Sequence, residues 1–361
     1  MKLKRLVFIF TLLHLLYSAI SHASQNMTTF KFSNENQLNK NFSNDINTFW
    51  DKKAESHYFY GVDNKKIHTV SIKSANNKVI VISQGRNESV LKYKEVAFDL
   101  YQQGYDLFLI DHRGQGFSER LGGDQFRGHV QNFQDYVTDL NQFIHSLDLQ
   151  KHYQYRYLLA HSMGGTISAL YLEQYPHPFQ AASLFSPMLS INIGGIPNSI
   201  AKILTYSSAE ICSWFNDKAC YIFAGGPHKI KSFQGNDLTS SEVRFRASQN
   251  TFLQAPTTQL GSATMRWVAE SISASEAAVA SANNIKIPVL VIQAGDDSVV
   301  SASGQNDFFA NMKNCKDKQL MTIDGAQHEI LLESDPYRSN ALNATLQFFS
   351  KSQQGAQTCI K

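Results

Sequence analysis

The 361-residue sequence predicts an α/β fold in which helices flank a mostly parallel sheet and a cap is inserted into the chain. Three observations predict this architecture. Runs of β-branched residues, such as residues 79–82, are typical of strands that are buried on both faces of a parallel sheet. Segments with the helical spacing of apolar residues follow most of these runs. The alternation stops after Pro187 and resumes at Pro288, which predicts an insertion between these two positions.

The predicted elements follow one another in a regular order. Strands are expected at residues 68–72, 79–82, 105–110, 155–159, 181–185, 289–292 and 319–323. Core helices are expected at residues 93–102, 133–147, 163–175, 303–312 and 337–349, and the insertion has helix-like segments at 240–251 and 264–273. These elements predict a leader segment at residues 24–55, a core at 56–187 and 281–361, and a cap, or lid, at 188–280.

The N-terminus predicts a signal peptide over residues 1–23. A basic stretch, residues 1–5, precedes an apolar run at residues 6–20, and small residues then lead to a cleavage position after Ala23. The alternative is an uncleaved membrane anchor. That alternative is disfavoured because the run is shorter than the ~20 apolar residues of a bilayer span and contains His14. We therefore expect export of the mature chain, to the periplasm or beyond.

Composition favours some partners over others. The chain has 33 basic and 30 acidic residues, a net charge of +3, which gives no reason to expect nucleic acid as a partner. A weak attraction to anionic lipid headgroups is compatible with this charge, and so is a transient contact with a membrane surface.

The four cysteines form an even set, as is typical of exported proteins with disulfide bonds. We expect the pairs Cys212–Cys220 and Cys315–Cys359, since the first pair is local and the second would hold the C-terminus. Four free thiols or a metal site are the alternatives. The sequence contains no C-x-x-C motif, which disfavours zinc.

One motif predicts a nucleophilic serine. Residues 158–165 lead from a predicted buried strand through Ser162 directly into a predicted helix, with Ala160 two residues before the serine and Gly164 two residues after it. This is the spacing of the nucleophile elbow of α/β-hydrolases, G-x-S-x-G, with alanine in the first position. Small neighbours are needed because the serine takes a strained conformation at a sharp turn. The alternative is a tight strand-to-helix turn with an incidental serine.

A nucleophilic serine needs a base, and the base needs an acid that orients it. In this fold the acid and the base follow late strands, in the order Ser, Asp or Glu, His. His328 follows the last predicted strand in a glycine-containing loop and is the predicted base. Asp297 or Asp296 is the predicted acid, and Asp297 is preferred because of its spacing from the following Val-Val pair. Glu329 is expected to be a solvated or structural carboxylate.

The oxyanion hole is expected to consist of two backbone N–H groups. One is the amide of Met163, at the start of the helix that follows the serine. The second is predicted to be the amide of Arg86, next to Gly85 in the loop after an early strand. Residues 113–116 lack the third glycine of a dinucleotide-binding motif, and residues 328–332 do not form H-E-x-x-H, so neither a cofactor nor a metal is expected.

Several motifs resemble the bacterial lysophospholipase and monoacylglycerol lipase family. They are found at residues 110–118, 128–130, 133–140, 160–165, 185–188 and 265–268. The resemblance spans about residues 55–350 and implies an α/β-hydrolase fold with a lid, no cofactor, and hydrolysis of single-chain glycerolipids such as lysophospholipids or monoacylglycerols. The sequence departs from this family at Ala160, where glycine is usual, and at Gln84, where the oxyanion loop often has histidine.

The resulting hypothesis is an ester hydrolase that forms an acyl-enzyme on Ser162. We expect aromatic residues of the cap either to shape an acyl channel or to form the cap's own core; they are Trp214, Phe215, Phe223, Phe245, Phe252 and Trp267. An aminopeptidase or general esterase is the second hypothesis. A lipid-binding protein without catalytic activity is the third, and the presence of Ser, Asp and His candidates argues against it. The sequence leaves oligomeric state, headgroup and chain-length preference open.

Overall fold

The computed structural model describes residues 30–353 and residue 359. The chain divides into residues 1–31 and residues 32–361, and the fold below is that of the second unit. The predicted signal peptide lies outside the described residues. None of the helices in the described part combines the length and the apolar character needed to cross a bilayer.

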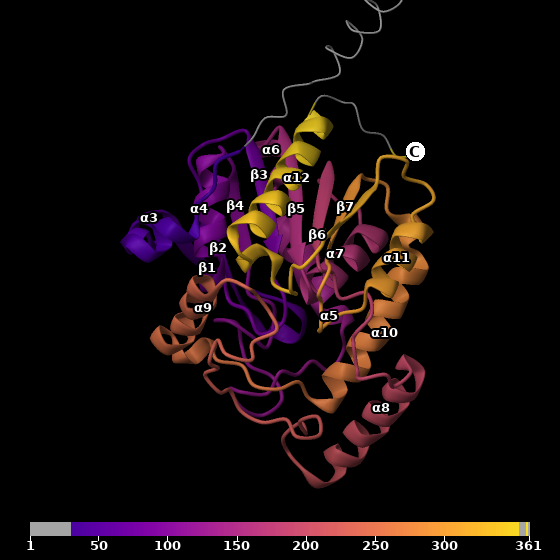
Figure 1. Ribbon diagram of the computed structural model, residues 1–361. Helices are drawn as coiled ribbons and strands as arrows, with labels where there is room; N and C mark the ends of the chain where they lie inside the picture. Colours follow the sequence, from indigo (N-terminus) through magenta and orange to yellow (C-terminus); the bar gives the residue numbers. More distant parts are fainter. Residues whose placement is uncertain (1–29, 354–358, 360–361) are drawn as a thin grey trace, which may run out of the picture. The chain divides into compact units, whose positions relative to one another are not determined.

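The core of the second unit is an eight-stranded sheet (Figure 1). Its strands have the spatial order β1-β2-β4-β3-β5-β6-β7-β8. The β1–β2 and β2–β4 pairs are antiparallel, and all other pairs are parallel. The bounds are β1 Ala54–Tyr60, β2 Lys66–Ile72, β3 Lys78–Ser83, β4 Asp106–Ile110, β5 Tyr155–His161, β6 Ala181–Phe185, β7 Val289–Ala294 and β8 Gln319–Ile323. The predicted mostly parallel sheet is confirmed, and every predicted strand overlaps an observed one.

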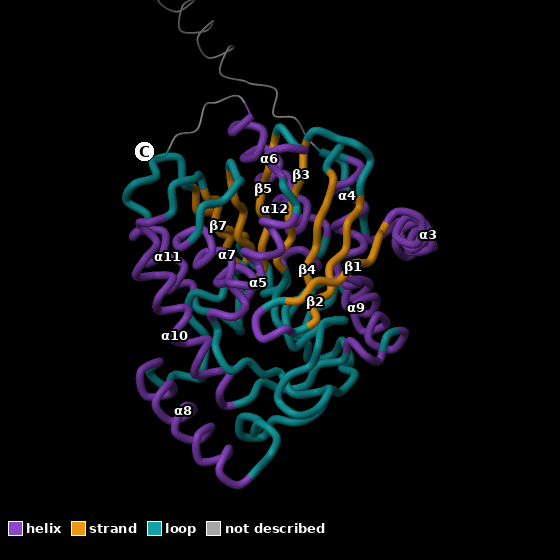
Figure 2. Tube along the Cα trace, turned by 180° about the vertical axis from the view of Figure 1, so that it is seen from behind, coloured by secondary structure: helices purple, strands orange, loops and turns teal. Residues whose placement is uncertain are grey.

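Helices cover both faces of this sheet (Figures 1 and 2). One face packs against α5 (Gln134–Ser146), α7 (Met163–Gln174) and α11 (Ala302–Asn311), and the other against α4 (Lys94–Gln102) and α12 (Asp335–Gln353). The short helix α6 (Leu149–His152) precedes β5. Because side chains of a strand alternate between faces, Leu158 lies in the cluster with α5 and α7 while Tyr157 stacks on Phe349 of α12, with ring centroids 4.2 Å apart.

The leader segment is more ordered than the sequence predicted. Residues 35–53 form α2 (Glu35–Gln37), a π-helical segment (Leu38–Phe42) and α3 (Ser43–Lys53), and α3 packs against α4 through the buried side chains of Ile46 and Trp50. The segment is rich in Asn and also contains Ser, and both residues have low or moderate helix propensity. Two apolar side chains four residues apart on one face supply the packing that the local composition does not reveal.

A buried ion cluster connects four separate parts of the chain. Arg244 of α9 (Glu242–Gln254) is 1% exposed, and its guanidinium binds Glu95 of α4 at 3.0 Å and Asp335 at the start of α12 at 2.8 Å. Arg338 of α12 binds Asp99 of α4 at 2.7 Å. Each buried charge thus has a partner of opposite sign, without which its burial would be very costly.

The N-terminal segment completes this cluster. The hydroxyl of Ser33 donates to Glu95 at 2.7 Å and to Asp99 at 2.8 Å, and the Ser33 amide donates to Asp99 at 2.8 Å. The Ser33 hydroxyl therefore binds the same carboxylate oxygens as the two arginines, and the Ser33 amide binds the Asp99 oxygen that Arg338 does not contact.

Residues 186–288 lie between the neighbouring strands β6 and β7 and add no strand to the sheet of the described chain. They contain α8 (Asn198–Phe215), α9 and α10 (Met265–Ser281). The sequence predicted α9 and the first half of α10, but it did not predict α8. In Figures 1 and 2, α8 and α9 lie beyond the same end of the sheet, on opposite sides of the view.

Both expected cysteine pairs are disulfide-bonded in the structure. Cys212, in the last turns of α8, is bonded to Cys220 in the loop that follows. Cys315 is bonded to Cys359, across a sequence separation of 44 residues.

Candidate active site

Ser162 lies at the turn between β5 and α7 with backbone angles φ 51° and ψ −119°. A positive φ is rare for a residue other than glycine and costs of the order of 1–3 kcal/mol. Three backbone hydrogen bonds hold this conformation. The Ser162 amide donates to the carbonyl of Phe185 at 3.0 Å, and the Ser162 carbonyl accepts from the amides of Gly165 at 2.8 Å and Met188 at 3.0 Å. The turn therefore presents the hydroxyl at the tip, as the sequence motif predicts.

The small residues of the motif have direct steric reasons. A Cβ on Gly164 would collide with the carbonyl oxygens of Ser83 and Gln84, and a Cβ on Gly165 would lie 2.6 Å from Cβ of Pro187. Close approach of α7 to the neighbouring backbone thus requires both glycines. Ala160 is fully buried in the hydrophobic core, so the position that often holds glycine has room for one methyl group here.

The structure brings the three predicted catalytic side chains together. The Ser162 hydroxyl lies 2.9 Å from Nε2 of His328, and Nδ1 of the same ring lies 2.8 Å from the carboxylate of Asp297. All three side chains are nearly buried. Asp296 is exposed, and its backbone amide donates a hydrogen bond to the carbonyl of Ala326 at 2.9 Å. Of the two neighbouring acids, Asp297 is therefore the one that contacts the histidine.

The environment of Asp297 favours its ionised form. Burial alone would raise the pKa of this carboxyl group by desolvation. The hydrogen bond and charge of His328, together with the amides of Val300 and Val299 at 3.0 and 2.9 Å, outweigh this effect and lower the pKa. The result is a carboxylate that accepts a hydrogen bond from Nδ1 of His328 and leaves Nε2 free to accept the serine proton.

The predicted oxyanion loop lies directly against the serine. A Cβ on Gly85 would lie 3.1 Å from Cβ of Ser162. The absence of a side chain at Gly85 therefore lets the backbone of the loop pass close to the serine. Met163 is the first residue of α7, where amide groups point out of the helix. Within residues 30–353 neither the amide of Arg86 nor that of Met163 donates a hydrogen bond. Both donors are thus available to a ligand at Ser162.

The side chain of Arg86 joins this loop to the insertion. Its guanidinium donates to the carbonyl of Gly261 at 2.7 Å and lies 5.0 Å from the ring centroid of Trp267. Burial lowers the pKa of Arg86 to about 10 by desolvation. The sequence predicts a role only for the backbone of Arg86, because the partner of its side chain lies 175 residues away and leaves no local pattern.

A buried charge cluster behind the serine was also missed. Glu88 accepts from the Gly85 amide at 2.5 Å and contacts Nδ1 of His161 at 3.1 Å and Nζ of Lys92 at 3.2 Å. Burial would raise the pKa of Glu88, but the charges of Lys92 and His161 outweigh this effect and lower it. Glu88 is therefore an anion that fixes the oxyanion loop on one side and two cations on the other.

The same cluster reaches the loop of the catalytic histidine. Nε2 of His161 donates to the carbonyl of His328 at 3.1 Å, and Lys92 binds Glu329 at 2.6 Å. Both ring nitrogens of His161 face acceptors, the carboxylate of Glu88 and the carbonyl of His328. Burial would lower the pKa of His161, but the charge of Glu88 outweighs this effect and raises it, which favours the protonated ring. Glu329 is mostly buried, and of the two roles predicted for it the structural one applies.

A second Ser–His–Asp arrangement occurs at the sheet edge. Ser56 lies 2.7 Å from Nε2 of His68, and Nδ1 of His68 lies 2.7 Å from Asp111. Ser56 has ordinary strand conformation within β1, and Asp111 also accepts the amides of Val90 and Phe117. Distances alone therefore do not identify a catalytic serine; the strained turn, the helix N-terminus and the adjacent glycine loop distinguish Ser162.

The six cap aromatics fall into two groups. Phe245, Phe252 and Trp267 are buried, whereas Trp214, Phe215 and Phe223 are 73, 78 and 94% exposed. The exposed three are therefore not part of a core of the insertion, and an acyl channel shaped by these aromatics stays a prediction. Trp214 and Phe215 lie in the last turn of α8, where no other element covers them.

Other candidate binding motifs have structural roles. Arg113, in the glycine-containing loop after β4, forms ion pairs with Asp139 at 2.6 Å and with Asp135 at 3.0 Å. The described residues include no group of three or more His, Cys, Asp or Glu side chains arranged to hold a metal ion.

Comparison with known proteins places this geometry in a family. The model of the family described as "Serine aminopeptidase, S33" matches residues 74–335. Lysophospholipase L2 of Escherichia coli strain K12 is 37% identical over 313 residues, which cover 85% of this chain and 90% of that protein. A probable lysophospholipase L2 of Haemophilus influenzae is 31% identical over 296 residues, covering 81% and 91% of the two chains.

Solved structures share the fold at lower identity. A soluble variant of monoglyceride lipase from Saccharomyces cerevisiae, in complex with a substrate analogue, has a TM-score of 0.64 and 19% identity, and the match covers 83% of this chain and 96% of that one. Monoacylglycerol lipase of Paleococcus ferrophilus has a TM-score of 0.60 and 18% identity, with 79% and 98% coverage. This chain therefore belongs to the α/β-hydrolase family described as serine aminopeptidase, S33, and is a relative of the bacterial lysophospholipases.

Proposed function

We propose that this protein is a serine ester hydrolase that releases the fatty acid from single-chain glycerolipids, lysophospholipids or monoacylglycerols, through an acyl-enzyme on Ser162. The observation that carries the proposal is the continuous chain of contacts from Ser162 through His328 to Asp297 at a strained strand-to-helix turn. The names of the relatives, lysophospholipase L2 and monoglyceride lipase, support the lipid substrate.

In the proposed acylation step, Nε2 of His328 takes the proton of the Ser162 hydroxyl while the oxygen attacks the ester carbonyl. Asp297 holds the ring in the required tautomer and stabilises the imidazolium that forms. The amides of Arg86 and Met163 donate to the oxyanion, an interaction that is stronger in the transition state than in the ground state. The imidazolium then protonates the leaving alcohol, and the acyl group remains on Ser162.

In the proposed deacylation step, water takes the place of the alcohol. His328 removes a proton from the water, the hydroxide attacks the acyl-enzyme, and the proton returns to Ser162 as the fatty acid leaves. Each step uses only side chains and amides of this chain.

An exposed apolar stripe on α8 supports access to substrate at a lipid surface. Two groups of apolar side chains along one side of the helix are about half exposed or more, with Ser207 and Ser208 between the groups; they are Ile200, Ile203 and Leu204, and Ile211, Trp214 and Phe215. Exposed apolar side chains with aromatic residues on one side of a helix are typical of helices that lie at a membrane interface. We propose that α8 makes transient contact with the membrane that holds the substrate.

Aminopeptidase activity is the alternative, since the family description names it. Binding of an N-terminal amine requires a carboxylate without a cation of its own. Three buried or mostly buried acids close to Ser162 are already engaged, because Glu88 and Glu329 both bind Lys92 and Asp297 binds His328. This arrangement favours the ester over the peptide.

We further propose that the protein acts outside the cytoplasm. Two disulfide bonds within the described chain support an oxidising compartment, where such bonds persist. The predicted signal peptide is consistent with export, and its cleavage after Ala23 would be seen directly in the mass of the mature protein.

The decisive experiment measures fatty-acid release from lysophosphatidylcholine and monoacylglycerol by the native protein and by Ser162→Ala. We expect the variant to lose activity by about 10⁴-fold or more, since the nucleophile is absent. Ser56→Ala is the matched control and should retain native activity. Cleavage of short p-nitrophenyl esters without release from either lipid would overturn the lipid assignment. Cleavage of aminoacyl amides at a higher rate than both lipids would favour the aminopeptidase.

A further inference from the structure

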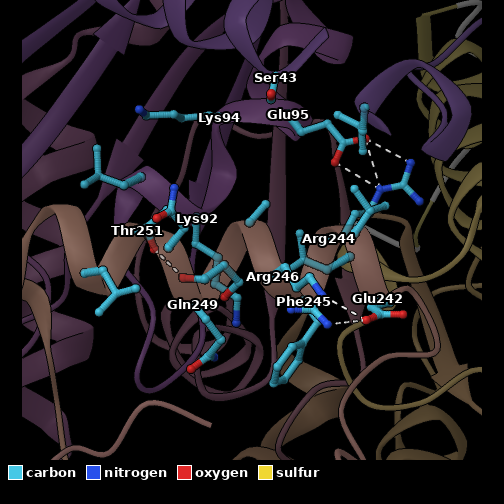
Figure 3. A pocket seen from close by; sticks show the side chains of 18 of the residues that line it. Ser43, Lys92, Lys94, Glu95, Glu242, Arg244, Phe245, Arg246, Gln249 and Thr251 are labelled. Atoms are coloured by element: carbon cyan, nitrogen blue, oxygen red, sulfur yellow. Dashed lines mark hydrogen bonds and ion pairs between the residues drawn. The ribbon is translucent and has the colours of Figure 1, made fainter. Parts of the chain in front are cut away.

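A cavity separate from Ser162 lies between α9 and the N-terminal helices (Figure 3). Its volume is about 970 Å³, and Ser162, Asp297 and His328 do not line it. One wall is α9, and the opposite wall comprises α3 and the start of α4. Cavities of 300–1,000 Å³ are typical of sites for small molecules, so the space is large enough for an eighteen-carbon chain.

Most of the wall is apolar. Ile46 of α3, Phe245 and Leu253 of α9, Phe233 in the preceding loop, and Leu332 line it. Leu253 is 57% exposed, whereas Ile46 and Phe245 are buried and border the cavity. An alkyl chain lying along α9 would cover these side chains and remove apolar surface from water at ~25 cal/mol per Å².

The charged groups of the cavity differ in whether they are compensated. Arg244 binds Glu95, and Arg246 binds Glu242, so these two cations have acidic partners. Lys94 has no acidic side chain within ion-pair distance in the part of the chain that the structure describes. Figure 3 shows Lys94 and Glu95 next to each other at the start of α4, with the Lys94 side chain directed away from the Arg244–Glu95 pair. Lys94 therefore gives the cavity a positive charge that Asp51 compensates only from beyond ion-pair distance.

The ammonium group of Lys94 is also incompletely solvated. Its recorded polar partner is the side-chain oxygen of Asn47 at 2.9 Å, and desolvation lowers its pKa. An anion placed beside this group would add a closer opposite charge and favour its ionised form. The combination of an apolar wall and one such cation matches a long alkyl chain that ends in a carboxylate.

We propose that this cavity binds one long-chain fatty acid anion, with its carboxylate against Lys94 and its alkyl chain along α9. The shape and charge of the cavity carry the proposal. The choice of a fatty acid among anionic amphiphiles rests on the proposed function, because that reaction releases this compound. The site is thus a second lipid site, distinct from the acyl position at Ser162.

The test is a titration with oleate of protein whose Ser162 carries a long-chain alkyl phosphonate, introduced with a fluorophosphonate and verified by mass. The covalent group occupies the acyl position, so binding that remains reports the second site. Isothermal titration is expected to give one site per chain. Oleyl alcohol, which has the same chain without the carboxylate, is expected to bind at least tenfold more weakly, equivalent to about 1.4 kcal/mol.

Two variants locate the site. Ala247→Trp places an indole on the cavity side of α9 and is expected to abolish binding, whereas Ala277→Trp, at an exposed alanine of α10, should not. Lys94→Glu reverses the charge at the first position of α4, where an acidic residue suits the helix. It should weaken oleate binding by more than tenfold, whereas Lys286→Glu, at an exposed lysine outside the cavity, should leave binding unchanged.

The outcomes separate this proposal from the proposed function. If fluorophosphonate fails to label Ser162, the enzymatic proposal fails, and the titration is made on unblocked Ser162→Ala protein, in which Ala247→Trp must remove one site. If the blocked protein binds no oleate, or if Ala247→Trp and Lys94→Glu bind as the native protein does, the second site is overturned. Equal affinity for oleyl alcohol overturns the carboxylate assignment.

Discussion

At the scale of single residues, Asp296 and Asp297 are neighbours in sequence with different surroundings. Only Asp297 contacts His328, and two amides fix its orientation. We expect Asp297→Asn to lower kcat by about 10⁴-fold, as in other Ser-His-Asp sites, because the amide stabilises the wrong tautomer of the histidine. Hydrolysis of a short p-nitrophenyl ester measures the effect.

Asp296→Asn is the matched control for this substitution. Its side chain is exposed, and the role of the residue in the loop is carried by the backbone bond to Ala326, which the substitution retains. The variant should keep native kcat. A large loss in Asp296→Asn with little loss in Asp297→Asn would mean that the other acid orients His328.

Glu173 of α7 gives a prediction about stability and pH. Neither carboxyl oxygen has a hydrogen-bond partner in the described chain, and burial raises the pKa to about 9. An unfolded chain ionises this group near pH 4.5, whereas the folded chain keeps it neutral to about pH 9. Between these values the folded state binds more protons than the unfolded state, so the contribution of Glu173 to stability falls as pH rises.

Glu173→Gln should therefore raise the free energy of unfolding at pH 8, by about 1–3 kcal/mol, and should have little effect at pH 4. Urea denaturation of both proteins at the two pH values gives the difference directly. An equal change at both pH values would show that ionisation of Glu173 is not the cause.

At the scale of elements, the sequence predicted the strands better than the N-terminal helix and α8. Strands β3, β5 and β7 are buried on both faces, which requires continuous runs of aliphatic residues. Few other structures need such runs, so these strands are easy to predict from the sequence. Helix α8 directs its aliphatic residues outward, and nothing in the sequence distinguishes an exposed apolar stripe from a buried one. Strand β1 pairs on one side only and is mostly exposed, so its composition is not that of a core strand.

The exposed stripe on α8 leads to a prediction about lipid surfaces. Replacing Ile203, Trp214 and Phe215 together by serine should lower activity on lysophospholipid in anionic vesicles several-fold, because less apolar area would enter the interface. Activity on a soluble short-chain ester should be unchanged. Equal loss on both substrates would mean that α8 supports the catalytic site rather than contact with the membrane.

The cluster around Glu88 gives a prediction for the loop between β3 and α4. Glu88→Gln would weaken the bonds that hold the Gly85 amide and His161 in place. We expect kcat to fall by about 10- to 100-fold with KM little changed, because the loop supplies a donor to the transition state. Glu276→Gln, which removes an exposed ion pair with Lys202, is the control and should retain native kcat. A change confined to KM, or to thermal stability, would assign the cluster a purely structural role.

At the scale of the whole molecule, the two disulfide bonds close loops of different length. Cys315–Cys359 spans 44 residues and Cys212–Cys220 spans 8. In the chain-entropy model the longer loop contributes about 4 kcal/mol and the shorter about 2.5 kcal/mol. The Cys315→Ser/Cys359→Ser protein should therefore melt at a lower temperature than the Cys212→Ser/Cys220→Ser protein, as measured by calorimetry. The reverse order would show that the cap bond, not the C-terminal bond, limits stability.

The candidate site was largely predictable because its parts follow strands in a fixed chain order. Ser162 follows β5 directly, Asp297 and His328 lie in the loops after β7 and β8, and parallel strands bring their carboxyl ends to the same edge. The supporting contacts were not predictable. Lys92 and Glu329 lie 237 residues apart, and Arg86 meets a carbonyl of the insertion 175 residues away. No local pattern encodes such pairs, since only the finished fold brings them together.

The position of Ser33 sets a practical limit on how the catalytic domain can be isolated. A recombinant chain trimmed to begin at residue 56, where the predicted core starts, would lose the hydroxyl and amide that satisfy Glu95 and Asp99. It would also lose Ile46 and Trp50, which cover α4. Glu95 and Asp99 would then lie beside the two arginines without the hydrogen bonds that Ser33 donates to them. Expression trials should therefore begin upstream of Ser33, and a shortened enzyme that aggregates would reflect the missing segment rather than a defect of the hydrolase core.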